Sequence, residues 1–557
     1  MGLTEISVLL ASAAGIGILA RLLKQPLLIG YLFAGVFLAF FGVVKDQEAL
    51  GAMGRIGIAL LLFLVGIEMN LRELPSLGKV ALLTGLGQIA FTSTLGFLIA
   101  LALGFAPIPS LYIAVALTFS STIIIVKLLS EKGDLGSLYG KIAVGFLLVQ
   151  DFVAVLILMF LSGFGRGGFG FGNVLIIGVK ALILFMGVWL LSKKVLPSIF
   201  EKVVGSSSEL LFIAAVAWAL GVSAIVGGPL EFSFEIGGFL AGLALSNLPE
   251  HMGVAAKTRP LRDFFLTIFF LYLGTQLLIS DFGSILTPAI IFSLFVLIGN
   301  PLIVLIIMGI MRYKKRSSFL ASVTVAQISE FSFILMAVGA SMGHVSQPQV
   351  ALVIVVGVIT MTISTYLILY SDKIYLKLKN SLTIFERKKT QEGGLENEAV
   401  FSDHIVLVGC NRVGMTLLPL FKKQKYSTLV IDHNPKIFNN LTAENIPALL
   451  GDIEDPDILD HANLEKAHMV ISSIPYVNDN LILIEYVMSL PRKPTLIIKA
   501  QSKSDAIKLY EKGANLVLIP EVITGEFLRH IFVSHGVSEE RIKKMGKSHF
   551  KRLLSRN

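Results

Sequence analysis

Long apolar blocks dominate the first two thirds of the sequence, and each is about as long as a helix that crosses a hydrocarbon core of about 30 Å. The 557-residue chain is 54% hydrophobic and only 15% charged, whereas soluble domains carry about 25% charged residues. We therefore predict a polytopic α-helical membrane protein. Thirteen candidate spans lie near residues 3–20, 26–43, 50–69, 79–104, 109–129, 139–161, 173–191, 209–226, 232–247, 263–280, 285–311, 318–342 and 349–370.

Positive charge alternates between the loops that join these blocks. Every second loop, beginning after the first span, carries Lys and Arg residues that together number twenty. The alternate loops and adjacent helix ends carry four, which are Lys45, Arg55, Arg166 and Lys180. Because Lys and Arg collect on the cytoplasmic side, we expect the N-terminus outside and the segment after the last span in the cytoplasm. The membrane is expected to be a prokaryotic plasma membrane.

The composition changes near residue 370, where charged residues return. We predict a transmembrane domain over 1–370, a linker over 371–401, a soluble α/β domain over 402–535 and a basic tail over 536–557. Cys410 is the only cysteine, which excludes an internal disulfide and a Cys-based metal site. The net charge of +9 follows largely from the loops, and no basic stripe with interleaved aromatic residues indicates nucleic-acid binding.

Gln150 and Asp151 stand near the middle of the apolar stretch 145–161. An ionised carboxylate there costs about 2.5–3.5 kcal/mol even on the insertion scale, so an intramembrane acid is a candidate functional group. The alternative is a neutral carboxyl that is hydrogen-bonded within the bundle. Desolvation favours the protonated form, whereas a bound cation or a helix N-terminus favours the ionised form. Asp151 is thus a candidate site for competition between a proton and a monovalent cation, and Gln150 either supplies a carbonyl ligand or points at a neighbouring span.

Two other spans carry polar interruptions, at residues 118–122 and 326–332. Small hydroxyls can satisfy the backbone of a broken helix or join two helices. A pair of interrupted spans is typical of transporters built from two inverted repeats, which bind their ion near the midplane. Glu330 either binds the cation or caps the broken helix, and we favour the structural role. The candidate ion-site residues are therefore Asp151, Gln150, Thr118, Ser120, Ser121, Thr122 and Glu330.

The chain resembles the monovalent cation/proton antiporter family, and within it the Kef-type potassium-efflux branch. The resemblance covers nearly the whole length and is carried by an ordered set of motifs. These are FLVGIEMNL (63–71), the segment from SSTIIIVKLLSEKG to VQD (120–151), GGFLAGLALS (237–246), RDFFLTIFFLYLG (262–274) and QISEFSFIL (327–335).

This resemblance implies a homodimer in which a core domain moves against a dimerisation domain, with crossed broken helices in spans five and twelve. The family's acid falls on Asp151, and Gln150 before it is the pattern associated with potassium. Asn300 stands where some relatives have a lysine that pairs with the acid. Some Kef relatives respond to glutathione, for which this sequence offers no support.

Residues 404–519 alternate between strand-like and helix-like segments, which predicts a doubly wound parallel sheet. The turn Gly409-Cys410-Asn411-Arg412-Val413-Gly414 matches G-x-G-x-x-G except that Asn411 replaces the middle glycine. Asp432 follows at the end of the next strand, where an acid can bind ribose hydroxyls. The alternative is a fold that keeps the pocket shape and binds nothing.

The same region resembles the RCK (TrkA-N) domain, whose members use this loop and acid for an adenine nucleotide. The resemblance favours AMP, with NAD possible, because Asn411 replaces a glycine that a pyrophosphate needs. It also suggests that residues 523–535 form a helix that crosses to a partner. The implied nucleotide-binding residues are Gly409, Asn411, Arg412, Val413, Gly414, Asp432, Asp452 and Ile453.

Together these features predict a secondary transporter rather than an enzyme. It would exchange potassium, or another monovalent cation, for protons by alternating access, under control of a nucleotide bound to the soluble domain. A sodium/proton antiporter is an open alternative. An RCK-regulated potassium channel is disfavoured because no TVGYG-like filter occurs, and a membrane-anchored NAD oxidoreductase because no catalytic constellation is present.

Overall fold

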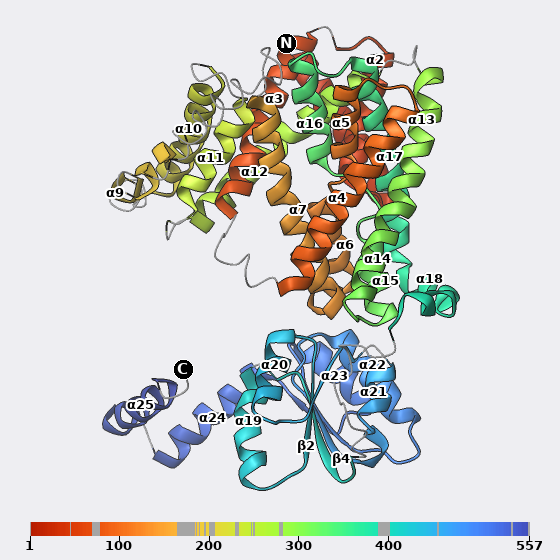
Figure 1. Cartoon of the computed structure of the whole chain (residues 1–557). Coiled ribbons are helices and arrows are strands. Elements are labelled where there is room, and N and C mark those ends of the chain that lie inside the picture. The colour runs from red at the N-terminus through yellow and green to blue at the C-terminus, as the bar shows by residue number, and fades with distance from the viewer. Residues whose placement is uncertain are drawn as a thin grey trace. The chain divides into compact units, whose positions relative to one another are not determined.

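The computed structural model divides into two compact units, Met1–Lys388 and Lys389–Asn557, and each is treated by itself (Figure 1). The division falls within the segment predicted as a linker. The structure describes residues 2–44, 46–68, 78–163, 184, 186–188, 190–193, 196–199, 207–228, 233–246, 248, 251–277, 282–387, 401–410, 412–453, 456–535 and 539–554.

The first unit is a bundle of helices. Every predicted span except 173–191, which lies mostly outside the described residues, coincides with one helix or a pair of half-helices. Seven helices of the described part are long and apolar enough to cross a membrane, by length and composition. The helices are α1 (Leu3–Leu22), α2 (Leu27–Phe40), α3 (Gln47–Glu68), α4 (Gly78–Ala102), α5 (Pro107–Ala116), α6 (Thr122–Lys132), α7 (Leu138–Gly163), α9 (Leu196–Ile199), α10 (Ser208–Gly227), α11 (Phe234–Leu245), α12 (His251–Thr275), α13 (Phe282–Leu294), α14 (Asn300–Ile310), α15 (Lys315–Val323), α16 (Glu330–Ser341) and α17 (Gln347–Leu369).

The prediction for α12 was wrong at its start, because the helix begins at His251 and not near residue 263. The first turns of α12 carry charged residues. A hydropathy pattern leaves such residues out of a membrane span, although the helix itself can continue beyond the lipid into water. One of these residues, Arg259, forms an ion pair with Glu68 at the end of α3, with an Nη2–Oε1 distance of 2.7 Å.

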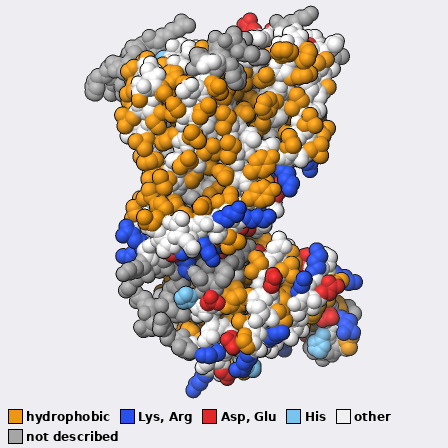
Figure 2. Space-filling view, turned by 90° about the vertical axis from the view of Figure 1, so that its right-hand side faces the viewer, with side chains coloured by type: hydrophobic (Ala, Val, Ile, Leu, Met, Phe, Trp, Pro, Cys, Tyr) orange, Lys and Arg blue, Asp and Glu red, His pale blue; other side chains and the backbone are white. Residues whose placement is uncertain are grey.

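The lateral surface of this unit suits a hydrocarbon environment. Figure 2 shows hydrophobic side chains over most of the face in view, with Lys and Arg side chains gathered at one end of this apolar surface. Exposed apolar residues on α2 and α4 contribute to the outer surface, among them Phe33, Phe37, Phe40, Leu82 and Leu83. An apolar surface of this extent is not tolerated in water.

Glycines let two pairs of helices in the bundle approach each other closely, α3 with α11 and α2 with α12. A Cβ atom at Gly242 of α11 would lie 1.9 Å from the Phe63 carbonyl oxygen of α3, and one at Gly66 would lie 2.3 Å from the Phe239 carbonyl oxygen. A Cβ atom at Gly35 of α2 would lie 2.1 Å from the Leu271 carbonyl oxygen of α12. Small residues at such contacts are the usual means by which membrane helices pack.

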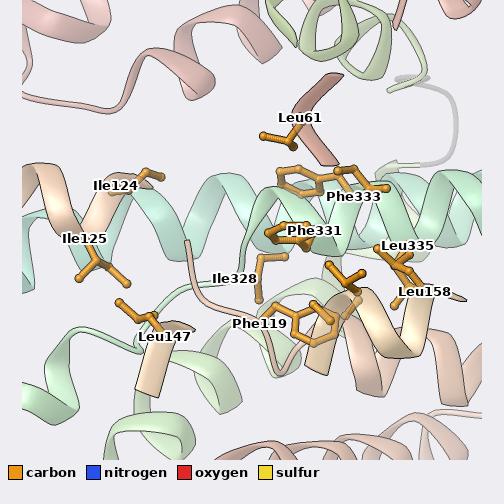
Figure 3. Packing of buried hydrophobic residues seen from close by; sticks show 14 of the residues in the cluster. Leu61, Phe119, Ile124, Ile125, Leu147, Leu158, Ile328, Phe331, Phe333 and Leu335 are labelled. Carbon is orange, nitrogen blue, oxygen red and sulfur yellow. The ribbon is translucent and has the colours of Figure 1, made fainter. Parts of the chain in front are cut away.

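The two predicted interruptions are real breaks in the helices. Span five consists of α5 and α6, and span twelve of α15 and α16. The segments between the halves are non-helical at residues 117–121 and 324–329. Figure 3 shows Phe119 from the first segment and Ile328 from the second within one hydrophobic cluster, together with Phe331 and Phe333 of α16.

The second unit is a six-stranded parallel sheet in the order β3-β2-β1-β4-β5-β6. This order confirms the predicted doubly wound fold. Strands β1 to β3 extend toward one edge of the sheet and strands β4 to β6 toward the other, so the strand order reverses between β1 and β4. Buried apolar side chains form two clusters in this unit. The strands are β1 (His404–Val408), β2 (Thr428–Asp432), β3 (Ala448–Leu450), β4 (Ala467–Ser472), β5 (Thr495–Lys499) and β6 (Leu516–Leu518), and the helices are α19 (Arg412–Lys423), α20 (Pro435–Ala443), α21 (Pro456–His461), α22 (Val477–Ser489), α23 (Lys503–Lys512), α24 (Pro520–His535) and α25 (Glu539–Leu554).

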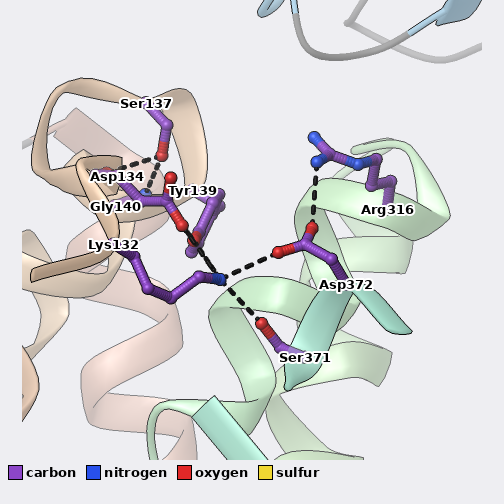
Figure 4. Close-up of polar contacts among 8 residues, drawn as sticks. All are labelled: Lys132, Asp134, Ser137, Tyr139, Gly140, Arg316, Ser371 and Asp372. Carbon is purple, nitrogen blue, oxygen red and sulfur yellow. Dashed lines mark hydrogen bonds and ion pairs between the residues drawn. The ribbon is translucent and has the colours of Figure 1, made fainter. Parts of the chain in front are cut away.

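A cluster of charged residues ties α6 to α18 (Ser371–Leu378), the helix that follows α17 (Figure 4). The Lys132 ammonium lies 2.9 Å from carboxylate oxygens of both Asp134 and Asp372, and it donates to the Ser371 hydroxyl at 2.9 Å. Arg316 of α15 also pairs with Asp372, at 3.1 Å. We call these five residues the Lys132 cluster.

The Asp372 carboxylate of the Lys132 cluster stays ionised over the physiological pH range. Burial alone would raise the pKa of Asp372, but Lys132 and Arg316 lower it below its usual value of 3.8. A carboxyl whose pKa is depressed in the folded state contributes stability above its unfolded-state pKa, and that stability is lost only as the pH falls through the folded-state value. The contacts of Asp372 with Lys132 and Arg316 are therefore not pH-sensitive in this range.

Lys132→Met is expected to lower the free energy of unfolding of the first unit by about 3 kcal/mol. Lys132 and Asp134 are largely buried, and removing one partner of a buried ion pair costs about 3–5 kcal/mol; the low end applies because Asp372 is 47% exposed. Thermal unfolding of the detergent-solubilised protein measures the effect. Lys127→Met is the matched control on the same helix, because it removes only the exposed pair with Glu131. Equal melting temperatures for the two variants would contradict the assignment.

Candidate functional site

The break between α5 and α6 exposes backbone groups, and nearby hydroxyls satisfy several of them. The Ser121 hydroxyl caps α6 by accepting a hydrogen bond from Ile124 N at 3.4 Å. The Thr118 hydroxyl donates to Val115 O at 2.7 Å. Ser120 Oγ is buried and has no hydrogen-bond partner among the described residues. Such an unsatisfied buried oxygen requires an explanation, and a bound ligand is one.

Gln150 points at this break. Its side-chain carbonyl oxygen accepts a hydrogen bond from Ser120 N at 3.3 Å. Its amide group donates to Gln88 Oε1 of α4 at 2.7 Å. Gln150 is fully buried, so the structure places it in the second of the two predicted orientations, toward the neighbouring span. Its carbonyl oxygen binds the backbone of the broken helix in this structure.

The network continues from Gln88 to the other side of the break. Gln88 donates to Thr92 Oγ1 at 3.1 Å, and Thr92 donates to Asn300 Oδ1 at 2.6 Å. Asn300 then donates to Leu117 O at 3.2 Å. The backbone N–H of Ser120 and the backbone C=O of Leu117 are thus hydrogen-bonded to the two ends of one continuous chain of buried, neutral side chains. The sequence analysis did not select Gln88 and Thr92, although two polar residues four positions apart within an apolar block would have been a usable signal.

Asn300 occupies a special position on its helix. It begins α14, directly after a π-helical turn at Phe295–Gly299. Single π turns inside α-helices are frequent at functional sites. Asn300, which the resemblance places where some relatives have a lysine, is a neutral residue. Its amide group donates a hydrogen bond to Leu117 O in the break between α5 and α6.

Asp151, on α7, lies against the start of α6. Its Oδ2 atom accepts a hydrogen bond from the Thr122 hydroxyl at 2.8 Å, and Thr122 is the first residue of α6. The carboxylate is therefore near the positive end of the α6 dipole. Asp151 is partly buried, and none of the ion pairs in the described part of the chain includes it. Such a carboxylate can take up either a proton or a cation.

Glu330 lies at the start of the other half-helix, α16, and is 2% exposed. The Ser329 hydroxyl donates to Glu330 Oε2 at 3.2 Å. Glu330 is close enough to Asp151 for its charge to act on that carboxylate. The Ser332 hydroxyl of α16 donates to Ala116 O, at the end of α5, at 2.5 Å. The structure thus brings the two breaks together, with one carboxylate at each.

A cavity of about 510 Å³ leads to Glu330 from one end of the bundle. Residues of α6 and α12 line it together with the segment that joins α1 to α2. Its lining also includes Ile123, the residue that follows Thr122 on α6. The charged lining residues are Arg21, Lys24, Lys127, Glu131, Arg262, Asp263 and Glu330.

A second cavity, of about 280 Å³, also involves α12 and α16. The first cavity uses residues 262–267 of α12 and Glu330 of α16. The second uses Phe269, Tyr272 and Leu273 of α12, Gln276 just after that helix, and residues 337–341 of α16. Phe270 of α12 and Phe333 of α16 meet edge to face, with ring centroids 6.2 Å apart. Both rings are fully buried, so the two cavities lie toward opposite ends of a packed aromatic contact.

The second unit holds the predicted nucleotide loop at the carboxyl ends of its strands. Gly409 follows β1 with a φ of +80°, and a Cβ atom on Gly414 would lie 2.7 Å from the Gly409 carbonyl oxygen. Asp432 ends β2, and its carboxylate accepts hydrogen bonds from Cys410 N at 2.7 Å and from Asn434 N at 2.8 Å. One carboxylate oxygen of Asp432 therefore holds the loop at Cys410, and the other holds the turn that follows β2.

The other predicted nucleotide residues are less informative. Asn411 and the side chains of Arg412 and Val413 lie outside the described part of the chain. Asp452 follows β3 and is partly buried. Ile453 is 1% exposed and belongs to the hydrophobic core.

Cys410 lies inside the loop and is fully buried. Burial, assisted by the charges of Asp432 and Glu444, raises the pKa of the Cys410 thiol to about 12. The thiolate is the reactive form of cysteine, so Cys410 is an inert thiol at physiological pH.

Comparison with known proteins identifies two families in one chain. The family description "Sodium/hydrogen exchanger, transmembrane" matches residues 8–369, and "TrkA-N domain" matches residues 405–520. Among curated proteins, the chain is 27% identical to YbaL of Escherichia coli (strain K12), provisionally named a cation/proton antiporter, over 91% of this chain and 92% of that protein. It is 24% identical to KefB of Alkalimonas amylolytica, provisionally named a K⁺ efflux antiporter, over 93% of this chain and 79% of that protein.

A solved structure supports the same fold for the helical unit. The sodium proton antiporter MjNhaP1 from Methanocaldococcus jannaschii superposes with a TM-score of 0.50 at 14% sequence identity. The match covers 67% of this chain and 97% of that one. At this level of identity the likeness concerns the fold alone.

Proposed function

Because this chain belongs to the sodium/hydrogen exchanger family, we propose that it exchanges a monovalent cation for protons across a membrane, with Asp151 as the group that both solutes share. The chain is a transporter and not an enzyme, and its relatives YbaL and KefB are named as antiporters. Potassium is the proposed cation, on the strength of the Kef-type resemblance. Sodium is the alternative.

One observation carries this proposal, which is the environment of Asp151. The carboxylate accepts a hydrogen bond from the first residue of a half-helix, and a cavity reaches the next residue, Ile123. The neighbouring Ser120 hydroxyl oxygen is left without a partner in the described part of the chain. Carboxylate and hydroxyl oxygens are ligands suited to a hard cation, and proton binding to Asp151 would release that cation.

The proposed cycle follows from the two cavities. In one state Asp151 communicates with the cavity at the end that carries Arg21 and Lys24, which we assign to the cytoplasm from the distribution of positive charge. In the other state it communicates with the opposite cavity. Since the carboxylate carries either a proton or a cation, each passage moves one solute, and exchange follows from alternation between the states.

Measurement of flux with each cation in turn tests the proposal. Everted membrane vesicles loaded at several pH values should release or take up protons when K⁺ is added, and Na⁺ serves as the comparison. A response to K⁺ that saturates and requires a proton gradient supports exchange. Cation movement without stoichiometric proton movement would favour a channel, and no movement of either solute would refute the proposal.

The soluble unit is proposed to bind an adenine nucleotide and to control transport. The TrkA-N family match and the glycine loop beside Asp432 support this assignment. AMP is preferred over NAD because Asn411 replaces a glycine of the dinucleotide fingerprint. A nucleotide can shift the transport equilibrium only if its affinity differs between the two transport states.

Asp432→Ala is expected to weaken nucleotide binding by about tenfold, because a charge-assisted hydrogen bond to a ribose hydroxyl is lost. Calorimetry on the full chain, with AMP and NAD titrated separately, measures the affinity. Asp505→Ala, at the capped start of α23, is the control for loss of a carboxylate elsewhere in the same unit. Because Asp432 also binds two loop amides, thermal unfolding without nucleotide must accompany the titration. Unchanged affinity in a folded Asp432→Ala protein would remove the ribose contact.

A further inference from the structure

The smaller cavity contains a buried carboxylate that the proposed cycle does not use. Glu235 is the second residue of α11 and is only 7% exposed. Burying a carboxylate is costly unless its charge is compensated. It lines the cavity of about 280 Å³ together with polar groups from α3, α12 and α17, at the end of the bundle away from Arg21 and Lys24.

The lining of this cavity changes from polar at its mouth to apolar at its floor. Arg55, Ser341 and Gln347 are exposed, whereas Ile58, Phe269 and Leu273 are almost fully buried. Glu235 is a buried lining residue with a carboxyl group, and Arg55 is a cation whose charge acts on it. Within the described part of the chain, the cavity lining contains no other Asp, Glu, Lys or Arg residue.

A helix-capping role does not by itself explain the burial of Glu235. The acid stands two positions after the capping residue Ser233, where it favours the helix dipole. Glu209 of α10 has the same setting, two positions after the capping residue Ser207, and it is exposed. An acid can therefore interact with the start of a helix without being buried, as Glu209 does on α10. Glu235 differs from Glu209 in that it lines a cavity.

Three of the residues that line this cavity carry oxygen atoms suited to a monovalent cation. They are Glu235, which has a carboxyl group, Tyr272, which has a phenol, and Gln276, which has an amide. Arg55 is positively charged and exposed on the facing helix α3, so it opposes a cation near Glu235. The buried layer that contains Phe270 and Phe333 lies toward the other cavity and Glu330.

We propose that Glu235 is a second cation-binding group, which receives the transported monovalent cation in the outer half of the path before it reaches Asp151. This inference rests on the proposed function. It assigns one buried carboxylate to each half of the path, Glu330 on the side of Arg21 and Lys24 and Glu235 on the opposite side. Arg55 sets the affinity of the outer site by its positive charge.

Transport kinetics measured separately at each face of the membrane test the assignment of Glu235. Right-side-out and everted vesicles containing the full chain are compared for the K⁺ concentration that gives half-maximal exchange at each face. Glu235→Gln is expected to raise this concentration about fivefold or more at the outer face and to leave it within about twofold at the inner face, because a charged ligand is lost on one side only. Arg55→Gln is expected to lower the half-maximal K⁺ concentration at the outer face, because a positive charge that opposes the cation is removed.

Matched variants make the result decisive. Glu209→Gln removes the exposed acid from the equivalent position on α10 and should change neither face. Glu235→Asp keeps the charge and should retain most of the outer affinity if Glu235→Gln fails to fold. An unchanged outer value, or equal shifts at both faces, would overturn the inference while wild-type exchange upholds the proposed function. Absence of exchange in the wild type would overturn the proposed function and this inference with it.

Discussion

Asp151→Asn should abolish cation-driven proton movement, with a loss of at least about 100-fold, while the protein remains folded and inserted. Asparagine has nearly the same size, and its carbonyl oxygen can still accept the hydrogen bond from Thr122. It can neither take up a proton nor offer a negative charge to a cation. Proton flux in everted vesicles on addition of K⁺ measures the effect, and equal thermal unfolding of the two proteins verifies the fold.

Asp263→Asn is the control for this experiment. Asp263 also lines the larger cavity, but it is 63% exposed and pairs with its neighbour Arg262. An exposed ion pair contributes about 0–1 kcal/mol, so near-normal exchange is expected. Substantial exchange in Asp151→Asn, or an equal loss in both variants, would show that the shared carboxylate lies elsewhere.

Gly242→Leu should prevent correct packing of the helical bundle. The first atom of any side chain at this position would lie 1.9 Å from the Phe63 carbonyl oxygen, so α3 and α11 would have to separate along their contact. Overpacking of a core costs about 1–3 kcal/mol when side chains can adjust, and more is expected here because the obstacle is backbone. Yield after detergent extraction and the melting temperature of the remaining protein measure the loss.

Gly221→Leu is the matched substitution in the same unit. Gly221 lies within α10, and a Cβ atom there would have no atom within 4 Å. Replacement of a helical glycine that has open space around it should be neutral or slightly stabilising. If the two variants unfolded alike, the close approach of α3 and α11 would not be a determinant of the fold.

Local patterns in the sequence were sufficient to predict most of the fold. Hydropathy located the described spans, and hydroxyl-rich runs within apolar blocks predicted both helix breaks, because unsatisfied backbone groups in lipid require polar neighbours. The alternation of strand and helix signals predicted the parallel sheet. The start of α12 was misplaced because hydropathy detects lipid burial and does not detect a helix that continues into water.

The site was predictable only in part, because its organisation depends on pairs that are distant in the sequence. The combination of Asp151 with Thr122 and Glu330 follows from adjacent breaks, but nothing local links Thr92 to Asn300, which are 208 positions apart. Without that link, Asn300 was a departure from relatives with no assigned role. Glu235 has no local signal in the sequence that marks it as a site residue, because burial and cavity lining are properties of the assembled bundle.

The half-helix α6 connects two of the contacts described above. Its eleven residues form a helix of about 16 Å, with Thr122 against Asp151 at one end and Lys132 bound to Asp372 of α18 at the other. A displacement of α18 would therefore act directly on the end of α6 that lies opposite Asp151, with no other helix between them.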